Sequence, residues 1–190
     1  MAMGIALDKL GYVDVIIPHM QEESASEFVA VVFSRVHGFN MNSTPEDRLG
    51  IDLPEWGAES TFKSVPKHLR LFGAIETLRE FLAQPQQGRL RAVGISFSKP
   101  ALVKSTDQFA TVFRDCKASK GQPAHLRRLA RRGHSVEKVV RYRPGFSIQA
   151  TSKSTGERFY LALSKKPMPA EQTISFTNYG TTLSGALPQF

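Results

Sequence analysis

Apolar and polar positions along the first part of the chain predict a strand followed by a helix. The β-rich run 12–17 predicts the strand, and within 22–36 apolar residues recur every four positions, which places them on one helical stripe. Gly38 is expected to end this helix, because glycine tolerates the left-handed conformation after a C-cap. His37 is therefore predicted to lie near a helix C-terminus.

The stretch that follows predicts three more strands and a second helix. Residues 48–54 and 68–72 predict two strands, 74–84 a helix that stops at Pro85, and 90–98 a fourth strand. The resulting order, βαββαβ, is that of a ferredoxin-like layer of helices on an antiparallel sheet, so the fold class expected is α+β. Since common RNA-recognition modules share this topology with many other proteins, it does not by itself give a function.

The second half of the chain predicts a smaller α+β unit. Residues 100–121 show no sustained period, so we place the domain boundary there, with a ferredoxin-like domain over 1–100 and a C-terminal domain over 101–190. That domain is expected to contain a short basic helix, a β-hairpin and a last strand, at 123–132, 146–163 and 174–179.

Charge is distributed unevenly over the 190 residues. Lys and Arg number 25 against 17 Asp and Glu, a formal charge of +8. Of the basic residues, 14 lie between Arg114 and Lys166 among only three acidic ones, which leaves 11 basic and 14 acidic residues in the rest of the chain. A surplus in this position indicates a polyanionic partner for the C-terminal half.

Other features of the composition narrow the class of protein. The single cysteine, Cys116, excludes an internal disulfide and a zinc site of several thiolates. The chain has no signal-peptide pattern and no run near the ~18 apolar residues of a membrane span, so we expect a soluble cytoplasmic protein. Paired carboxylates with metal-ligand spacing and a phosphate-binding glycine loop are also missing from the sequence, so we expect neither a metal nor a cofactor.

The predicted helix at 123–132 separates apolar from cationic residues. Its leucines fall on one side of a helical wheel, and the opposite arc carries two i, i+4 pairs of arginines: Arg127, Arg128, Arg131 and Arg132. Such guanidiniums offer bidentate donors to phosphates or guanine edges. The alternative is a solvated basic face, but such a face normally intersperses acidic partners, and none stands among the four arginines. We favour nucleic-acid binding, with a short stem-loop suiting the helix better than a long A-form duplex.

Several motifs resemble those of the subtype I-F CRISPR repeat-processing endoribonucleases. They are, in order, the arginine helix His125-Leu-Arg-Arg-Leu-Ala-Arg-Arg-Gly-His134, the stretch Ser152-Lys-Ser-Thr-Gly-Glu-Arg-Phe159 and the C-terminal Phe176-Thr-Asn-Tyr-Gly180. Upstream, 36–40, 49–54 and 69–85 resemble the N-terminal domain of that family. Each motif alone is weak, whereas the set in this order is fairly specific.

The resemblance implies a fold and a function together. The fold is a ferredoxin-like N-terminal domain followed by a smaller RNA-binding domain with the arginine helix. The function is metal-independent cleavage at the 3′ base of a repeat hairpin, which leaves a 2′,3′-cyclic phosphate and a 5′-hydroxyl. The family also implies that the chain keeps the cleaved hairpin and joins other subunits in a type I-F surveillance complex.

Four active-site residues are implied as well. His37 matches the catalytic histidine, and attack of a ribose 2′-OH on the adjacent phosphate needs a base that titrates near neutrality. Ser152 matches a serine that would hold the 2′-OH in line, with Thr155 as a further hydroxyl. Tyr179 matches a tyrosine that would orient the histidine or contact the scissile nucleotide. From the residues alone, a capping histidine, the hydroxyls of an ordinary hairpin turn and a core tyrosine are open alternatives.

Two further residues match RNA contacts. Phe159 matches an aromatic that would stack on the terminal base pair, although the alternation around it equally predicts a side chain facing the core. Arg114 matches a base-reading arginine, but the glutamine that should accompany it is replaced, with Cys116 in its place. Cysteine cannot make the bidentate contact to adenine that glutamine makes, so we expect the hairpin recognised to differ from that of other members.

Two other functions stay open at this stage. One is a non-catalytic RNA-hairpin-binding subunit in which His37 serves only the structure, and single-turnover cleavage would separate it from the nuclease. The other is a DNA-binding or ribosomal-type protein that uses its basic half electrostatically, which a 2′-deoxy substitution at the scissile site would distinguish.

Overall fold

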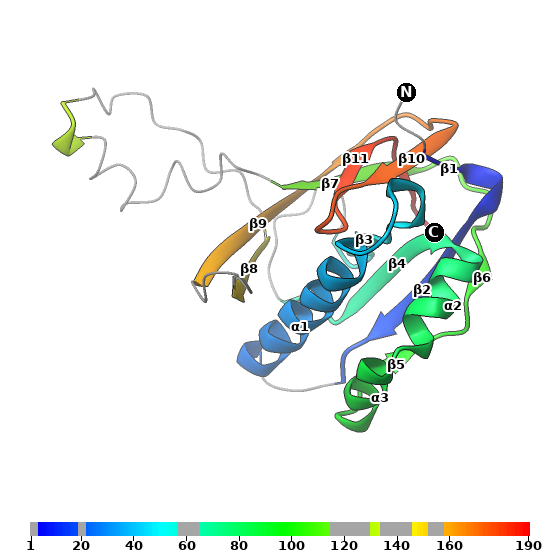
Figure 1. The fold of residues 1–190 in the computed structure, drawn as a ribbon. Coiled ribbons are helices and arrows are strands. Elements are labelled where there is room, and N and C mark those ends of the chain that lie inside the picture. The colour runs from blue at the N-terminus through cyan, green and yellow to red at the C-terminus, as the bar shows by residue number, and fades with distance from the viewer. Residues whose placement is uncertain (1–3, 19–21, 57–64, 115–129, 134–145, 152–157) are drawn as a thin grey trace.

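The computed structural model describes residues 4–18, 22–56, 65–114, 130–133, 146–151 and 158–190 (Figure 1). These residues contain the helices α1 (Glu22–Asn40), α2 (Ile75–Ala83) and α3 (Pro85–Ala92), with short 3-10 helices at Leu7–Lys9 and Pro45–Asp47. Three antiparallel sheets accompany them, so the predicted α+β class is confirmed. No helix within the described ranges is long and apolar enough to cross a membrane.

The largest sheet has the strand order β3-β4-β2-β5, and β6 also pairs with β2. Its strands are β2 (Leu10–Ile16), β3 (Gly50–Asp52), β4 (His68–Ala74), β5 (Ser96–Phe97) and β6 (Ala101–Leu102). With α1 between β2 and β3, and α2 between β4 and β5, the sheet has the predicted βαββαβ order.

Two smaller sheets are built mainly from the second half of the chain. The four-stranded sheet has the order β12-β7-β9-β8, with β7 (Phe109–Arg114), β8 (Phe146–Thr151), β9 (Arg158–Pro167) and β12 (Leu187–Pro188). The three-stranded sheet has the order β1-β10-β11, with β1 (Ile5–Ala6), β10 (Thr173–Phe176) and β11 (Thr182–Ser184). The antiparallel pairing of β8 with β9 confirms the predicted hairpin.

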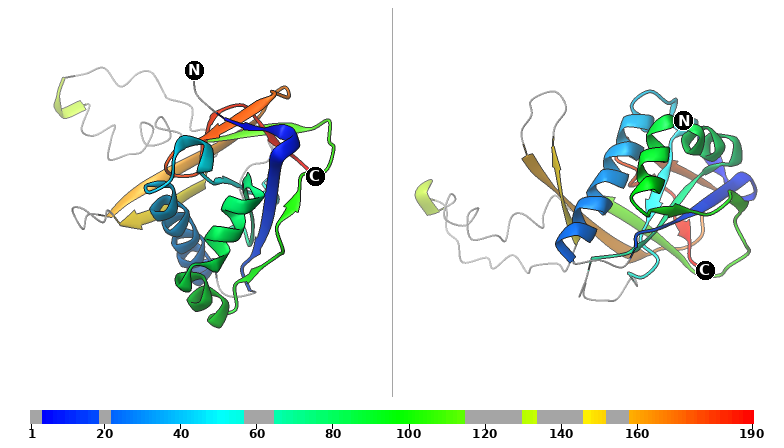
Figure 2. Two further views of the ribbon diagram at one scale, coloured as in Figure 1. Left: turned by 45° about the vertical axis from the view of Figure 1, so that its right-hand side comes forward. Right: turned by 90° about the horizontal axis from the view of Figure 1, so that it is seen from below.

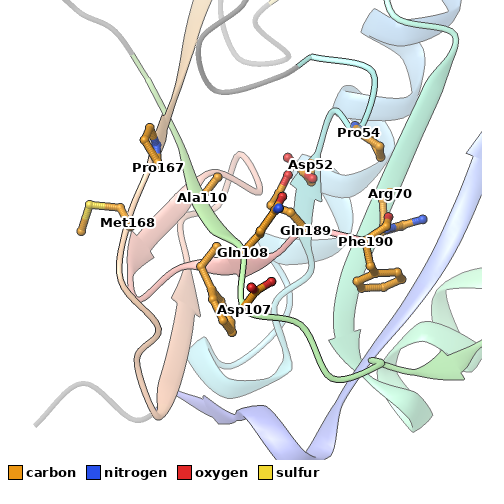
Figure 3. A pocket seen from close by; sticks show the side chains of 11 residues that line it. Asp52, Pro54, Arg70, Asp107, Gln108, Ala110, Pro167, Met168, Gln189 and Phe190 are labelled. Carbon is orange, nitrogen blue, oxygen red and sulfur yellow. The ribbon is translucent and has the colours of Figure 1, made fainter.

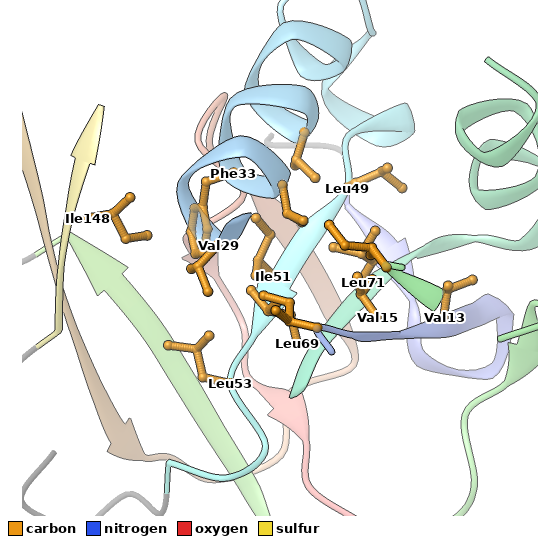
Figure 4. Close-up of a cluster of buried hydrophobic side chains, with 14 of the residues drawn as sticks. Val13, Val15, Val29, Phe33, Leu49, Ile51, Leu53, Leu69, Leu71 and Ile148 are labelled. Carbon is orange, nitrogen blue, oxygen red and sulfur yellow. The ribbon is translucent and has the colours of Figure 1, made fainter. Parts of the chain in front are cut away.

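Strand register decides which face of the largest sheet is apolar. Val13 stands opposite Leu71 and Val15 opposite Leu69, and all four side chains are fully buried. They face α1 and α2, so this face and the apolar stripes of the helices form one cluster (Figure 4). Burying each such side chain contributes about 1.5–3 kcal/mol.

The same core continues into the second half of the chain. Ile148 of β8 and Leu161 and Leu163 of β9 are buried in one cluster with Val29 and Val32 of α1. Both Figures 1 and 2 show α1 running beside the β8–β9 hairpin. The helix that carries His37 is therefore fixed from two sides, and the domain boundary at 100/101 stays a prediction.

Helix α1 is longer than expected. It runs on to Asn40, so the prediction that Gly38 ends it is wrong, although His37 does lie in its last turn. Tertiary contacts outweigh the low helix propensity of glycine here, because Phe39 packs in the core and the Asn40 side chain bonds to the backbone of Leu49.

Two other expectations were wrong for local reasons. Most of 90–98, predicted as a strand, belongs to α3 or to the turn after it, and only Ser96–Phe97 pairs as β5. Pro85 begins α3, since proline suits the first helical position.

Residues 100–121, predicted to be irregular, contain β7, whose Ala110, Thr111 and Val112 are all buried. A strand buried on both faces lacks the alternation that reveals a half-buried one.

Candidate active site

His37 projects from the last turn of α1 and is partly exposed. Its Nδ1 lies 3.1 Å from the main-chain carbonyl oxygen of Asn178. Because a carbonyl oxygen can only accept, Nδ1 carries the proton of the neutral ring and donates it. The lone pair then resides on Nε2, which is the form of histidine able to take a proton from a hydroxyl.

Tyr179 lies directly against this imidazole. The two ring centroids are 4.2 Å apart and the ring planes differ by only 2°, a stacked arrangement. In the 177–180 turn, Asn178 thus fixes a ring nitrogen of His37, and the next residue, Tyr179, covers the face of the His37 ring. The structure brings together two predicted site residues that are 142 positions apart in the sequence.

A tight turn presents Tyr179 to the helix. Gly180 N–H donates to the Thr177 carbonyl at 3.0 Å, and the Tyr179 N–H donates to Thr177 Oγ1 at 3.2 Å. Gly180 has a φ of +76°, and a Cβ on it would lie 2.9 Å from Cγ1 of Ile51. Both the left-handed backbone and the close approach to β3 therefore require glycine at this position.

Arg114 reaches the same place from β7. It is the last residue of that strand and is exposed, and its guanidinium carbon lies 5.9 Å from the centroid of the Tyr179 ring. This distance is at the outer limit of a cation–π contact. Three predicted residues, His37, Arg114 and Tyr179, thus meet from three separate parts of the chain, with a cation placed beside the stacked rings.

A family model described as CRISPR-associated protein (Cas_Csy4) matches residues 12–190. The chain belongs to the Csy4 family. This is a family of CRISPR endoribonucleases of subtype I-F, so the chain is an endoribonuclease that binds CRISPR repeat RNA and processes it. A search of curated proteins gave no match to this sequence.

The other predicted site residues of this Csy4-family chain are placed only in part. Ser152, Thr155, Arg127, Arg128 and Cys116 lie outside the described residues. Of the helix predicted at 123–132, Ala130 and Arg131 are described as helical and Arg132 lies in the turn after them. The side chains of Arg131 and Arg132 are exposed.

Phe159 lies on β9, where its backbone is in register with Ala150 of β8. The prediction of a stacking role for its side chain is not tested by this pairing. Thr151 and Arg158, which come directly before and after the residues 152–157 in the sequence, are paired.

One contributor to the site of this Csy4-family chain was not visible in the sequence. Asn178 orients His37 through its carbonyl oxygen, which every residue type possesses, so no side-chain pattern could indicate it. The nearby Phe-Thr-Asn-Tyr-Gly motif was the available signal, since it marks the turn as a whole.

A separate hollow of about 540 Å³ lies away from these residues (Figure 3). Asp52, Arg70 and Phe190 line it together with Met168, and none of His37, Arg114 and Tyr179 does. Its charged residues of both signs do not suit a polyanion. We therefore place the candidate active site at the His37–Tyr179 pair and not in the hollow.

Proposed function

We propose that this Csy4-family chain cleaves its repeat RNA without a metal ion. Cleavage takes place at the 3′ base of the hairpin by attack of a ribose 2′-OH, and leaves a 2′,3′-cyclic phosphate and a 5′-hydroxyl. The observation that carries the proposal is the oriented imidazole: Asn178 holds Nδ1 of His37, Tyr179 covers the ring, and Nε2 keeps its lone pair.

The chemistry needs one base and one proton donor. Nε2 of His37 takes the proton of the 2′-OH as that oxygen forms a bond to phosphorus. The bond from phosphorus to the 5′ oxygen breaks, and this oxygen gains a proton from the imidazolium or from water. Ser152, with Thr155, holds the 2′-OH in line with the leaving oxygen, and Tyr179 keeps the imidazole at the attacking oxygen.

Binding and cleavage are assigned to different residues. The arginines Arg127, Arg128, Arg131 and Arg132 hold the stem by its phosphates and bases, and Phe159 stacks on the terminal base pair. Arg114, beside Tyr179, contacts the RNA next to the scissile phosphate. The chain then keeps the cleaved hairpin and joins other subunits of a type I-F surveillance complex.

The test is single-turnover cleavage of the host's repeat hairpin in EDTA. We expect wild type to cut, His37→Ala to bind the hairpin without cutting it, and an RNA with a 2′-deoxy nucleotide at the cut to survive. His68→Ala is the matched control, because His68 lies on β4 and bonds to Asp14 instead of the site. The product is checked for a cyclic phosphate by mass spectrometry.

Two outcomes would overturn the proposal. Tight binding by wild type with no cleavage would make the chain a hairpin-binding subunit. Cleavage that disappears in EDTA and returns with a divalent cation would show that a metal ion supplies the chemistry instead.

A further inference from the structure

Asn40 is a polar side chain sealed inside the molecule next to the candidate active site. It is the last residue of α1 and is fully buried, whereas most asparagines are exposed. A buried amide costs free energy unless its donors and acceptor are paired, so its partners indicate what it does.

The amide of Asn40 joins three segments of the chain. Its Oδ1 accepts from the N–H of Leu49 at 2.8 Å, and its Nδ2 donates to the Leu49 carbonyl at 2.9 Å. The same Nδ2 donates to the carbonyl of Thr177 at 3.3 Å. One side chain therefore ties the end of α1 to the residue before β3 and to the turn that carries Tyr179.

Asn40 and His37 act on this turn as a pair. They are three residues apart, which places them on the same side of the helix. His37 bonds to the carbonyl of Asn178 and Asn40 to that of Thr177, so two successive carbonyls of the turn are held by two side chains one helical turn apart. The turn is therefore held by α1 at two points, in addition to the bond from the Ile51 N–H to the Gly180 carbonyl at 2.8 Å.

We propose that Asn40 is a positioning residue for the candidate active site. Through Thr177 it holds the turn against α1, so that the Tyr179 ring stays stacked on His37. The inference rests on the proposed function, since the stack matters for cleavage only if His37 is the base. Asn40 itself touches neither RNA nor the reacting atoms.

Thr177 holds the same turn from within. Its hydroxyl lies 2.7 Å from the hydroxyl of Thr181 and accepts from the N–H of Tyr179. Thr177→Val keeps the shape of the side chain and removes both hydroxyl contacts, while the two Asn40 bonds to Leu49 stay intact. It therefore perturbs the held turn without opening the core.

The experiment compares Asn40→Ala and Thr177→Val with wild type and with Asn42→Ala. Asn42 is the matched control, because among the described residues its amide bonds to the carbonyl of Gly38 and to neither Leu49 nor the 177–180 turn. We expect Asn40→Ala to lower the single-turnover cleavage rate at saturating protein by up to about tenfold, the loss expected when the Tyr179 ring no longer stacks on His37. The dissociation constant for the hairpin should stay close to that of wild type.

A second readout does not depend on catalysis. A ring stacked on His37 shifts the NMR resonances of the imidazole protons through its ring current. The Tyr179→Leu variant gives the chemical shifts of these protons without the stack. We expect Asn40→Ala and Thr177→Val to move the His37 resonances toward those chemical shifts, and Asn42→Ala to leave them unchanged.

The outcomes separate the two proposals. Wild-type His37 resonances and cleavage rates in folded Asn40→Ala would overturn the positioning role. If that variant does not fold, wild-type values in Asn40→Asp would do so, because this change keeps the Oδ1 acceptor for the Leu49 N–H and removes the Nδ2 donor to the Thr177 carbonyl. If His37→Ala still cleaves, the proposed function fails, and the resonances alone then show whether Asn40 holds the stack.

Discussion

The ring of Tyr179 lies parallel to the His37 imidazole, so its aromatic surface holds the histidine. Tyr179→Leu removes this surface, and stacked aromatic pairs contribute ~0.5–1.5 kcal/mol beyond burial. We therefore expect a fall of up to about tenfold in single-turnover cleavage at saturating protein. Tyr179→Phe keeps the ring and should keep most of the rate. If the Phe variant were as slow as the Leu variant, the hydroxyl would be the important group.

Asp14 links two basic side chains on the other face of the largest sheet. Its Oδ1 lies 2.7 Å from Nε of Arg70 and 2.8 Å from Nε2 of His68. Burial alone would raise the pKa of the Asp14 carboxyl, but the hydrogen bonds and charges of Arg70 and His68 outweigh burial and lower this pKa. The carboxylate therefore stabilises the fold above the ordinary pKa near 3.8, and this contribution is lost as the pH falls through the lowered pKa.

This linkage predicts how Asp14→Asn changes stability with pH. At pH 7 the variant should lose about 2 kcal/mol, since hydrogen bonds to charged groups contribute about 1.5–3 kcal/mol. The difference from wild type should shrink below about pH 4, where wild type loses the same contribution. Urea unfolding at both pH values measures it, with Glu76→Gln as a control because Glu76 pairs with Arg79 at an exposed position. An equal difference at both pH values would contradict the linkage.

At the scale of elements, two glycines are predicted to respond in opposite ways to alanine. Gly180→Ala places a Cβ against Ile51 and Val36 and forces a left-handed backbone on alanine, which alone costs about 1–2 kcal/mol. Gly88 lies within α3 with open space around it, so Gly88→Ala should stabilise by about 0.5–1 kcal/mol. Thermal unfolding compares the two variants. A Gly180→Ala protein as stable as wild type would show that the turn is not held as described.

The sequence indicated most of the elements but not the contacts that complete them. The pattern of apolar residues indicated α1, α2, β2, β3, β4 and the β8–β9 hairpin. It gave β5 as the longer strand 90–98 and did not indicate β6. It missed β7, which is buried on both faces, and it placed the end of α1 at Gly38, where packing of Phe39 decides otherwise. A local pattern carries no information on such long-range packing.

In the candidate site, too, the sequence indicated residues but not the contacts between them. His37, Arg114 and Tyr179 were found through motifs, but their meeting depends on how α1, β7 and the 177–180 turn pack, which spacing cannot give. Asn178 and Asn40 were missed because one acts through its backbone and the other through a buried amide.

At the scale of the whole molecule, a buried ion pair joins the largest sheet to the four-stranded one. Nζ of Lys165 on β9 lies 2.8 Å from Oδ1 of Asp52 on β3, with side-chain exposures of 1% and 2%, and it also donates to the Leu53 carbonyl. Lys165→Met leaves the carboxylate buried and unpaired, which we expect to cost about 3–5 kcal/mol. The double variant with Asp52→Leu should recover much of this loss. Urea unfolding of wild type, the two single variants and the double variant forms a double-mutant cycle. Additive effects of the two substitutions on the free energy of unfolding would contradict the pairing.

The concentration of basic residues in the second half of the molecule predicts the salt dependence of RNA binding. Each arginine that neutralises a phosphate contributes about 0.7–0.9 to the slope of log Kd against log salt concentration. We expect Arg131→Ala and Arg132→Ala, both at exposed positions, each to lower the slope by about this amount when hairpin affinity is titrated at several salt concentrations. Arg79→Ala is the control, because Arg79 is exposed on α2 and pairs with Glu76. Unchanged slopes for Arg131 and Arg132 would mean that these arginines form a solvated face, and the RNA would then have to bind through other parts of the basic half.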